Sequence, residues 1–152
     1  MSYNMIDISY SKTDLKFLNY NVNGLLQKLE DSDFILYIQS HDIICLTETF
    51  VATEFESDLF SDFLIFTSKA LKLSHHGRYS GGVIVLIKKK LSAFIKHIPV
   101  NVENTIVIKL DNASLGTEKD IMCICSYIPP MTQTTGKLHQ MGMVWSRLNP
   151  VT

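Results

Sequence analysis

A short apolar run ending in one carboxylate constrains this chain most: Asp42-Ile-Ile-Cys-Leu-Thr-Glu-Thr-Phe50. The apolar residues at 43–46 leave no polar face, which is typical of a strand that is buried on both sides. Glu48 follows just past the run, where a central strand would leave its sheet. Two interpretations of Glu48 stand at this point. It is either a solvent-exposed carboxylate at a strand end, or a carboxylate that rigid backbone holds in place to bind a metal ion or a proton.

The rest of the chain predicts several more strands and one helix. A helix is expected to begin after Asp31 or Ser32, since either side chain can cap it. Its apolar stripe is Phe34, Ile35 and Ile38. The strand patterns cover residues 14–20, 63–66, 83–87, 91–98, 105–110 and 121–127. Because a strand, a helix and a strand come first and hairpin-like spacing follows, we expect an α/β sandwich of mixed sheets, with 105–110 as an outer strand.

Turn and loop chemistry separates these elements. Asn and Gly within residues 21–25 end the first strand in a turn. Residues 69–80 form a mildly basic stretch without a strand pattern, and a mobile loop is expected there. Gly81 and Gly82 then open the strand at 83–87. Since no helix follows this glycine pair, it indicates close strand packing or a bulge and not a phosphate-binding loop.

The composition fits one globular domain, with 152 residues, 46% of them apolar and 19% charged. A net charge of −1 gives no overall attraction to nucleic acid or to a membrane, so any such binding needs a local patch. No apolar run is long enough to span a bilayer, and the N-terminus lacks a signal-peptide pattern. Cys45, Cys123 and Cys125 lie in apolar runs. They favour reduced, packed thiols in an intracellular protein, whether nuclear or cytoplasmic.

Three segments are expected along the chain. Residues 1–13 are polar and irregular and predict a disordered N-terminus. Residues 14–130 carry the strand and helix patterns, and residues 131–152 form a divergent tail. Pro129 and Pro130 stop the last predicted strand. The tail has only a weak helical pattern, which is carried by Leu138, Met141, Val144, Trp145 and Leu148.

Four short motifs carry a resemblance to a known family: Leu18-Asn-Tyr-Asn-Val-Asn-Gly-Leu25, Ile44-Cys-Leu-Thr-Glu-Thr49, Tyr79-Ser-Gly-Gly-Val-Ile-Val-Leu86 and Ser126-Tyr-Ile-Pro-Pro130. Each is weak alone, but in order and spacing the four resemble the endonuclease/exonuclease/phosphatase family. Within that family they are most similar to the endonuclease domains of non-LTR (LINE-type) retrotransposons. The resemblance implies a four-layer α/β sandwich of the DNase I-like type. It also implies metal-assisted hydrolysis of phosphodiesters, with Mg²⁺ or Mn²⁺ as the cofactor.

The resemblance assigns roles to three residues. Glu48 resembles the carboxylate that binds the divalent metal. Asn21 resembles the Asn that closes the first strand and helps to hold the metal-bound phosphate. Tyr127 resembles the active-site Tyr near the scissile phosphate. Without the family, Asn21 is equally an ordinary turn residue and Tyr127 an aromatic ring that shields the core at a strand end, and Asn23 is a weaker site candidate.

DNA is the substrate that the resemblance implies, and it points to the basic stretch at 69–80. Related nucleases meet DNA with loops at the edge of the site, so we expect Arg78 to contact phosphate and Tyr79 to stack on a base. Lys88, Lys89 and Lys90 fit a solvated strand end better than a phosphate patch. No membrane partner is expected, and no protein partner can be inferred.

Two motifs that the resemblance leads one to expect are missing. The sequence has no Asp-x-Asn strand end after Tyr127, which would orient the attacking water, and no Ser-Asp-His, whose His would contact the phosphate. We therefore expect only the N-terminal half to two-thirds of the family domain, from a truncated or interrupted reading frame. One sheet's inner apolar surface should then be left uncovered, and the chain should be prone to aggregation.

Three functions remain open from the sequence. The first is a metal-dependent DNA endonuclease of retroelement type, incomplete in this chain. The second is a phosphatase or another phosphodiesterase of the same fold. The third is an inactive remnant of such an enzyme.

Overall fold

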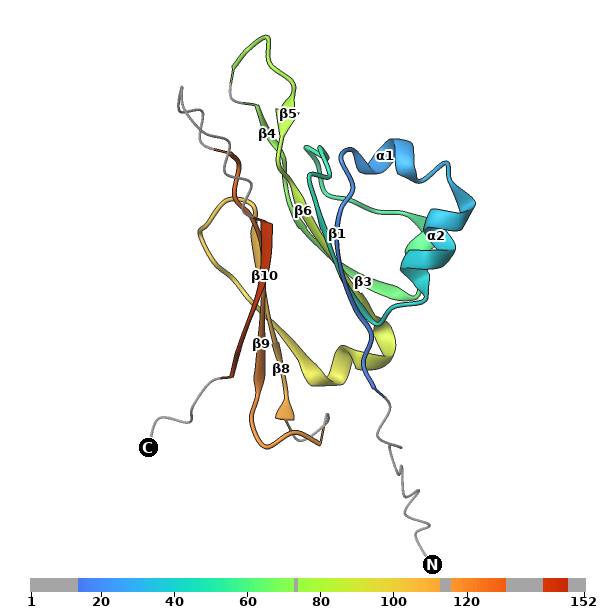
Figure 1. The fold of residues 1–152 in the computed structure, drawn as a ribbon, viewed down its shortest axis with the longest axis vertical. Coiled ribbons are helices and arrows are strands. Elements are labelled where there is room, and N and C mark those ends of the chain that lie inside the picture. The colour runs from blue at the N-terminus through green and yellow to red at the C-terminus, as the bar shows by residue number, and fades with distance from the viewer. Residues whose placement is uncertain (1–13, 73, 113–115, 131–140, 148–152) are drawn as a thin grey trace, which may run out of the picture.

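The computed structural model of the protein describes residues 14–72, 74–112, 116–130 and 141–147 (Figure 1). The expected disordered segment at 1–13 lies outside the described residues, as do 131–140 and 148–152 of the tail. The elements in chain order are β1 (Phe17–Asn21), α1 (Leu25–Lys28), α2 (Ser32–Gln39), β2 (Ile43–Thr47), η1 (Asp58–Phe60), β3 (Phe63–Ser68), β4 (Leu71–Lys72), β5 (Tyr79–Ser80), β6 (Val83–Lys88), η2 (Lys89–Phe94), β7 (Ile95–Ile98), β8 (Thr105–Leu110), β9 (Ile121–Tyr127) and β10 (Met141–Arg147).

Two four-stranded sheets make up the body of the structure. The first has the strand order β1-β2-β6-β3, in which β1 and β2 run parallel and the other pairs are antiparallel. The second has the order β10-β9-β8-β7 and is antiparallel throughout. Strands β4 and β5 form a separate two-stranded ribbon. The prediction of mixed α/β architecture is therefore confirmed.

Strand β2 lies inside the first sheet and is buried on both faces. Ile44 and Leu46 point to the side covered by the helices, where they join a core with Ile38. Ile43 and Cys45 point to the opposite side and pack against the second sheet. All four side chains are at most 1% exposed. The continuous apolar run predicted this double burial because neither face of such a strand can meet water.

The helices cover one face of the first sheet only, so the described residues form three layers: helices, first sheet and second sheet (Figure 1). Of the two predicted caps for α2, Asp31 is the one used, because its carboxylate accepts hydrogen bonds from the backbone N–H groups of Asp33 and Phe34. In the described part of the chain, no helix combines the length and the apolar character needed to cross a membrane.

Two strand predictions were wrong in detail. The expected strand at 91–98 begins as the 3₁₀ helix η2, which buries Leu91, and only Ile95–Ile98 is strand. The expected outer strand at 105–110 is an inner one, since β8 pairs with β7 on one side and β9 on the other. The prediction of an outer strand was based on polar positions in the segment, of which Lys109 is one. That lysine is satisfied by an ion pair with Asp120, at 2.7 Å.

Two segments without a predicted strand contain strands. Part of the expected loop at 69–80 is the ribbon β4–β5, in which Leu71 pairs with Ser80 and Lys72 with Tyr79. In the tail, residues 141–147 form β10 along β9, so the weak helical pattern there was wrong. Leu138 and Leu148 lie outside the described residues. In both cases the strand depends on pairing with a partner strand, which local periodicity does not report.

The expectation of an uncovered apolar sheet was wrong for the central strands β2 and β6. Strands β7 to β10 form a second sheet, and inner side chains of β8 and β9 pack against the first. Among the inner residues of the first sheet, Val83, Val85 and Ile87 are 0% exposed, and opposite them Ile108 and Cys125 are 0% exposed as well. The inner face of β2 and β6 is therefore packed and closed to solvent, while Phe17, Leu64 and Phe66 on the edge strands are half-buried.

The three cysteines are free thiols inside this inter-sheet core. A hydrogen bond with Cys125 and burial raise the pKa of the Cys45 thiol well above its ordinary value. Burial also raises the pKa of Cys123, to about 12. Both side chains therefore stay protonated at neutral pH and act as packing groups, as the strand pattern predicted.

One end of the sandwich is closed by a charge cluster around Asp42. This residue is 6% exposed and accepts ion pairs from Lys90, at 2.8 Å, and Lys88, at 3.7 Å, and a hydrogen bond from the Lys16 backbone N–H. Burial raises the pKa of the carboxyl, but these partners outweigh burial, so the net pKa is lowered. Lys88 and Lys90 thus stabilise the start of β2, at the end opposite Glu48.

Candidate active site at the strand ends

The strands β1, β2 and β9 all end at the other edge of the sandwich. Asn21 is the last residue of β1 and pairs with Thr47, the last residue of β2. Glu48 therefore follows directly where β2 leaves the sheet. Tyr127 ends β9 in the facing sheet, and its hydroxyl donates a hydrogen bond to the Glu48 carboxylate. The structure thus joins Glu48 to Tyr127 and places Asn21 on the neighbouring strand end. We call this end, defined by these three residues, the rim.

The backbone at the rim is unusual. Four non-glycine residues in the described part of the chain have positive φ, and all of them lie here: Asn23 at 46°, Glu48 at 52°, Phe50 at 56° and Asn104 at 53°. Asparagine tolerates this left-handed conformation, but for other residues it is uncommon and costs about 1–2 kcal/mol each. Backbone strain of this kind gathers at functional sites, where the surrounding structure enforces it.

Backbone hydrogen bonds hold Glu48 from two directions. Its carbonyl accepts the N–H of Gly24 at 2.8 Å, which ties it to the turn after β1. On the opposite side, the N–H groups of Thr49 and Phe50 donate to the carbonyls of Gly82, at 3.2 Å, and Gly81, at 3.1 Å. The segment that carries Glu48 is therefore clamped between the β1–α1 turn and the start of β6, so its carboxylate is presented by a fixed backbone.

The glycine pair makes this close packing possible. A Cβ at Gly81 would lie 2.4 Å from the Asn104 side-chain oxygen, and one at Gly82 would lie 2.5 Å from the Thr49 hydroxyl oxygen. Both glycines also have positive φ, of 71° and 86°. The prediction of close strand packing at this pair is confirmed. Only glycine lets β6 begin this near to its neighbours.

Asn104 links the two sheets at the rim, a role that the sequence analysis did not predict. Its side-chain oxygen accepts the N–H of Gly82 at 2.7 Å, and its carbonyl accepts the N–H of Tyr127 at 2.9 Å. The side chain is 8% exposed. The one local signal is an Asn just before a strand, a residue type that tolerates positive φ. Its partner Gly82 is 22 positions away, beyond the reach of any spacing rule.

Tyr127 is held in its protonated form. Burial, and then the hydrogen bond and the negative charge of Glu48, raise the pKa of the phenol to about 12. At neutral pH the hydroxyl is therefore a donor that orients the Glu48 carboxylate. The residue is 7% exposed and belongs to the inter-sheet core. Tyr127 therefore also shields the core at the end of its strand, the alternative role that the sequence analysis named.

Asn21 takes part in the turn that follows β1. Its side-chain oxygen accepts the N–H of Asn23 at 3.0 Å, the pattern of an Asx turn. This is the ordinary turn role that the sequence left open. The turn also sets the geometry beside Glu48, because the next residue, Gly24, donates to the Glu48 carbonyl.

The donor set at the rim suits one kind of metal site. The described residues contain no group of three His, Cys, Asp or Glu side chains arranged around a common point. Glu48 offers one carboxylate, and Asn21 offers an amide on the adjacent strand end. One carboxylate and one amide cannot fill the coordination shell of a metal ion without other ligands. Mg²⁺ keeps several waters and binds through one or two carboxylates plus substrate phosphate oxygens, so these residues fit it.

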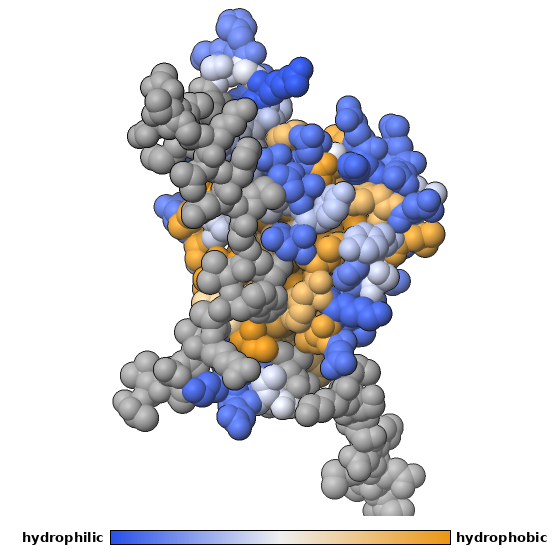
Figure 2. Space-filling view, in the orientation of Figure 1, coloured by the Kyte–Doolittle hydropathy of each residue, from blue (hydrophilic) through white to orange (hydrophobic). Residues whose placement is uncertain are grey.

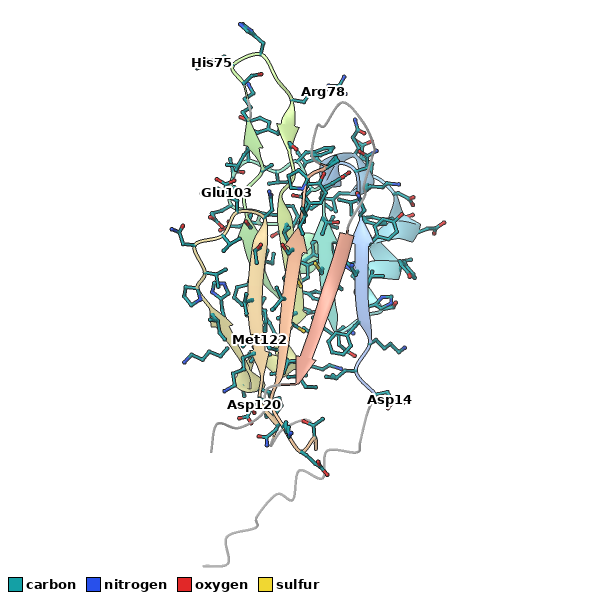
Figure 3. All side chains as sticks on the ribbon, turned by 60° about the vertical axis from the view of Figure 1, so that its left-hand side comes forward. Asp14, His75, Arg78, Glu103, Asp120 and Met122 are labelled. Atoms are coloured by element: carbon teal, nitrogen blue, oxygen red, sulfur yellow. The ribbon has the colours of Figure 1, made fainter. Side chains whose placement is uncertain are left out.

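The ribbon β4–β5 extends the same end of the molecule with positive charge. Figure 3 shows His75 and Arg78 at the end opposite Asp14 and Asp120. Residues 69–80 contain no Asp or Glu, and Figure 2 shows hydrophilic residues over this ribbon. Arg78 is exposed, and Tyr79 is 43% exposed with the Lys72 ammonium 5.3 Å from its ring centre. Both predicted DNA contacts are therefore accessible, on an arm that leads into Gly81.

The close packing at Gly82 can be tested by adding one carbon. Gly82→Ala should lower the free energy of unfolding by roughly 2–5 kcal/mol, because strain at positive φ adds to overlap with the buried Thr49 and with Ala70. Gly116→Ala is the matched control, with φ of 63° and nothing within 4 Å of the added carbon, and should cost only about 1–2 kcal/mol. Urea unfolding measures both. Equal losses would contradict close packing at Gly82.

The Tyr127–Glu48 contact predicts a titration. Tyr127 should ionise near pH 12, and Glu48→Gln should lower its pKa by removing the adjacent negative charge. The protonated phenol should add stability in full below the ordinary tyrosine pKa of about 10, and this stability should be lost as pH rises through 12. Ultraviolet titration against Tyr127→Phe isolates this tyrosine, and Glu56→Gln is the control. A wild-type Tyr127 that ionises near pH 10 would refute the contact.

Comparison with known proteins agrees with this geometry. The sequence profile of the endonuclease/exonuclease/phosphatase family matches residues 18–134, which is more than two thirds of the chain. No curated protein matches the chain significantly. The matched region holds every rim residue, from the β1 strand end to Tyr127, and the mixed sheets are consistent with the DNase I-like fold of that family. Its members are enzymes that hydrolyse phosphodiesters and phosphate esters. The chain belongs to the endonuclease/exonuclease/phosphatase family.

Proposed function

We propose that this chain is a divalent-metal-dependent DNA endonuclease domain of the retroelement type, on a DNase I-like four-layer sandwich of which the described residues supply three layers. The observation that carries the proposal is the Glu48 carboxylate, held in a left-handed backbone conformation and hydrogen-bonded to Tyr127 beside the end of β1. The retroelement subtype is supported by the four sequence motifs, which all lie within the family match.

Each residue at the rim has a distinct task in this proposal. Glu48 would hold Mg²⁺ or Mn²⁺, with Asn21 on the neighbouring strand end helping to position the metal-bound phosphate. A bound divalent ion supplies neutralisation of the charge that develops on the phosphate and on the leaving oxygen. Tyr127 keeps its proton at neutral pH and can offer a hydrogen bond to Glu48 or to a phosphate oxygen.

DNA is favoured over a small phosphoester by the arm at the rim. A sugar phosphate bound at Glu48 would make no use of the ribbon β4–β5, whereas a DNA strand bound there could extend along it. The exposed Lys72 and Arg78, with His75 and His76 between them, put positive potential where the backbone of a long substrate would run.

The metal assignment is tested by two measurements on one variant. Glu48→Ala should reduce Mg²⁺-dependent nicking of supercoiled plasmid at least about 100-fold, because the rim loses its one carboxylate. It should also abolish binding of Mn²⁺, followed by the electron paramagnetic resonance signal of the free ion. Glu56→Ala removes an exposed carboxylate elsewhere and should change neither result. Equal Mn²⁺ binding by Glu48→Ala and wild type would refute the site.

The other two candidate functions give different outcomes in the same experiment. A phosphatase of this fold would release inorganic phosphate from a phosphomonoester and leave the plasmid intact. An inactive remnant would do neither, yet it would still show the Tyr127 titration, because that depends only on folding.

The arm is tested by the salt dependence of DNA binding. Arg78→Ala should weaken binding to a duplex in EDTA and reduce the slope of log affinity against log salt by about 1, the value for one lost phosphate contact. Lys96→Ala, an exposed cation on β7, is the control and should leave the slope unchanged. If Arg78→Ala keeps both affinity and slope, the arm does not meet phosphate.

A further inference from the structure

Phe50 lies beside the rim, and its side chain is not part of the core packing. It lies two positions after Glu48, and its side chain is 37% exposed. Its neighbours Thr49 and Val51 are buried, at 1% and 6% exposed. Phe50 itself belongs to neither hydrophobic core. The chain therefore turns two side chains inward and leaves an aromatic ring at the surface between them.

The backbone holds that ring in place against its local preference. Phe50 has a φ of 56°, and a bulky residue at positive φ is a genuine outlier. Its N–H is bonded to the Gly81 carbonyl at 3.1 Å, which fixes the conformation. A Cβ built on Gly24 would lie 3.6 Å from the ring atom Cδ2 and 3.9 Å from Cε2, so the ring rests beside the bare backbone of the β1–α1 turn.

A strained, exposed and well-supported aromatic ring is suited to binding a flat apolar ligand. At the edge of a phosphodiester site, the flat group nearest to the phosphate is a nucleobase. Stacking of a base on an aromatic side chain works for every base, because each has a π-face. In an intact duplex both faces of a base are already covered, so a base must be unpaired or displaced before a protein ring can stack on it.

We propose that Phe50 is a stacking platform for an unpaired nucleobase next to the phosphodiester at Glu48, so that the chain prefers single-stranded or locally unpaired DNA over uniform duplex. This proposal rests on the proposed DNA endonuclease function and adds a substrate class to it. Phe50 acts by positioning the strand and takes no part in the bond-breaking step. The basic arm with Arg78 lies on the chain segment that leads into Gly81, and it supplies affinity that does not depend on pairing.

The test compares three DNA forms of one sequence: a single strand, a blunt duplex and a duplex with an unpaired bulge. Binding is followed by fluorescence anisotropy in EDTA, so that no cleavage occurs. Phe50→Ala should weaken binding to the single strand and the bulge about 5- to 140-fold, the range measured for losing one stacked base, and should leave duplex binding nearly unchanged. Phe50→Trp should retain the preference. Leu36→Ala, which truncates an exposed apolar residue of α2, should bind like wild type.

The failures of the two proposals are distinguishable. A wild-type chain that binds none of the three DNA forms overturns the DNA function and this inference together. If the wild type binds but Phe50→Ala lowers affinity for all forms equally, or for none, only the stacking role is overturned. Arg78→Ala should instead weaken all three forms alike.

A stability measurement separates a binding role from a packing role. Phe50→Gly relieves the positive φ, so its urea midpoint should equal or exceed that of the wild type while the preference for unpaired DNA is lost. A markedly lower midpoint would show that the ring is part of the core and would overturn the proposal.

Discussion

The burial of β2 on both faces is the constraint on which the rest of the structure depends. A strand whose side chains all avoid water needs a layer on each side, here the helices over Ile44 and Leu46 and the second sheet over Ile43 and Cys45. The same burial puts β2 inside its sheet, between β1 and β6. Residues 42–47 are buried, so Glu48 is the first side chain after the start of this segment that reaches solvent. It does so at the rim, where β2 leaves the sheet.

The two ends of β2 carry carboxylates with opposite surroundings. Asp42 at the start meets two lysine ammonium groups and a backbone N–H, which neutralise it and lower its pKa. Glu48 at the end meets the protonated hydroxyl of Tyr127, a donor without charge. A carboxylate with a neutral partner keeps its full negative charge for a cation from solution. This asymmetry marks one end of the sandwich as structural and the other as the candidate site.

Backbone geometry accounts for most of the order at the rim. Close approach at the glycine pair, the Asn104 link between the sheets and the left-handed residues form one connected arrangement. It holds Glu48 and Phe50 two positions apart in the segment that follows β2. The left-handed backbone conformation of Asn104 is offset by the two hydrogen bonds with which this residue links the sheets. At Phe50 the strained backbone donates a hydrogen bond to Gly81, but the exposed ring belongs to neither core, and for this reason we assign the ring to a ligand.

By itself, the sequence determined the strands with continuous apolar runs, the α2 helix with its cap at Asp31 or Ser32, and the mixed α/β class, and the family resemblance pointed to Asn21, Glu48 and Tyr127. These follow from local periodicity and from motifs that keep their spacing. Only the tertiary structure decided that 105–110 is an inner strand, that 141–147 pairs with β9, and that Asn104 joins the sheets. Strand neighbours and cross-sheet hydrogen bonds join residues far apart in the chain, and no local pattern records which distant backbone a strand will meet.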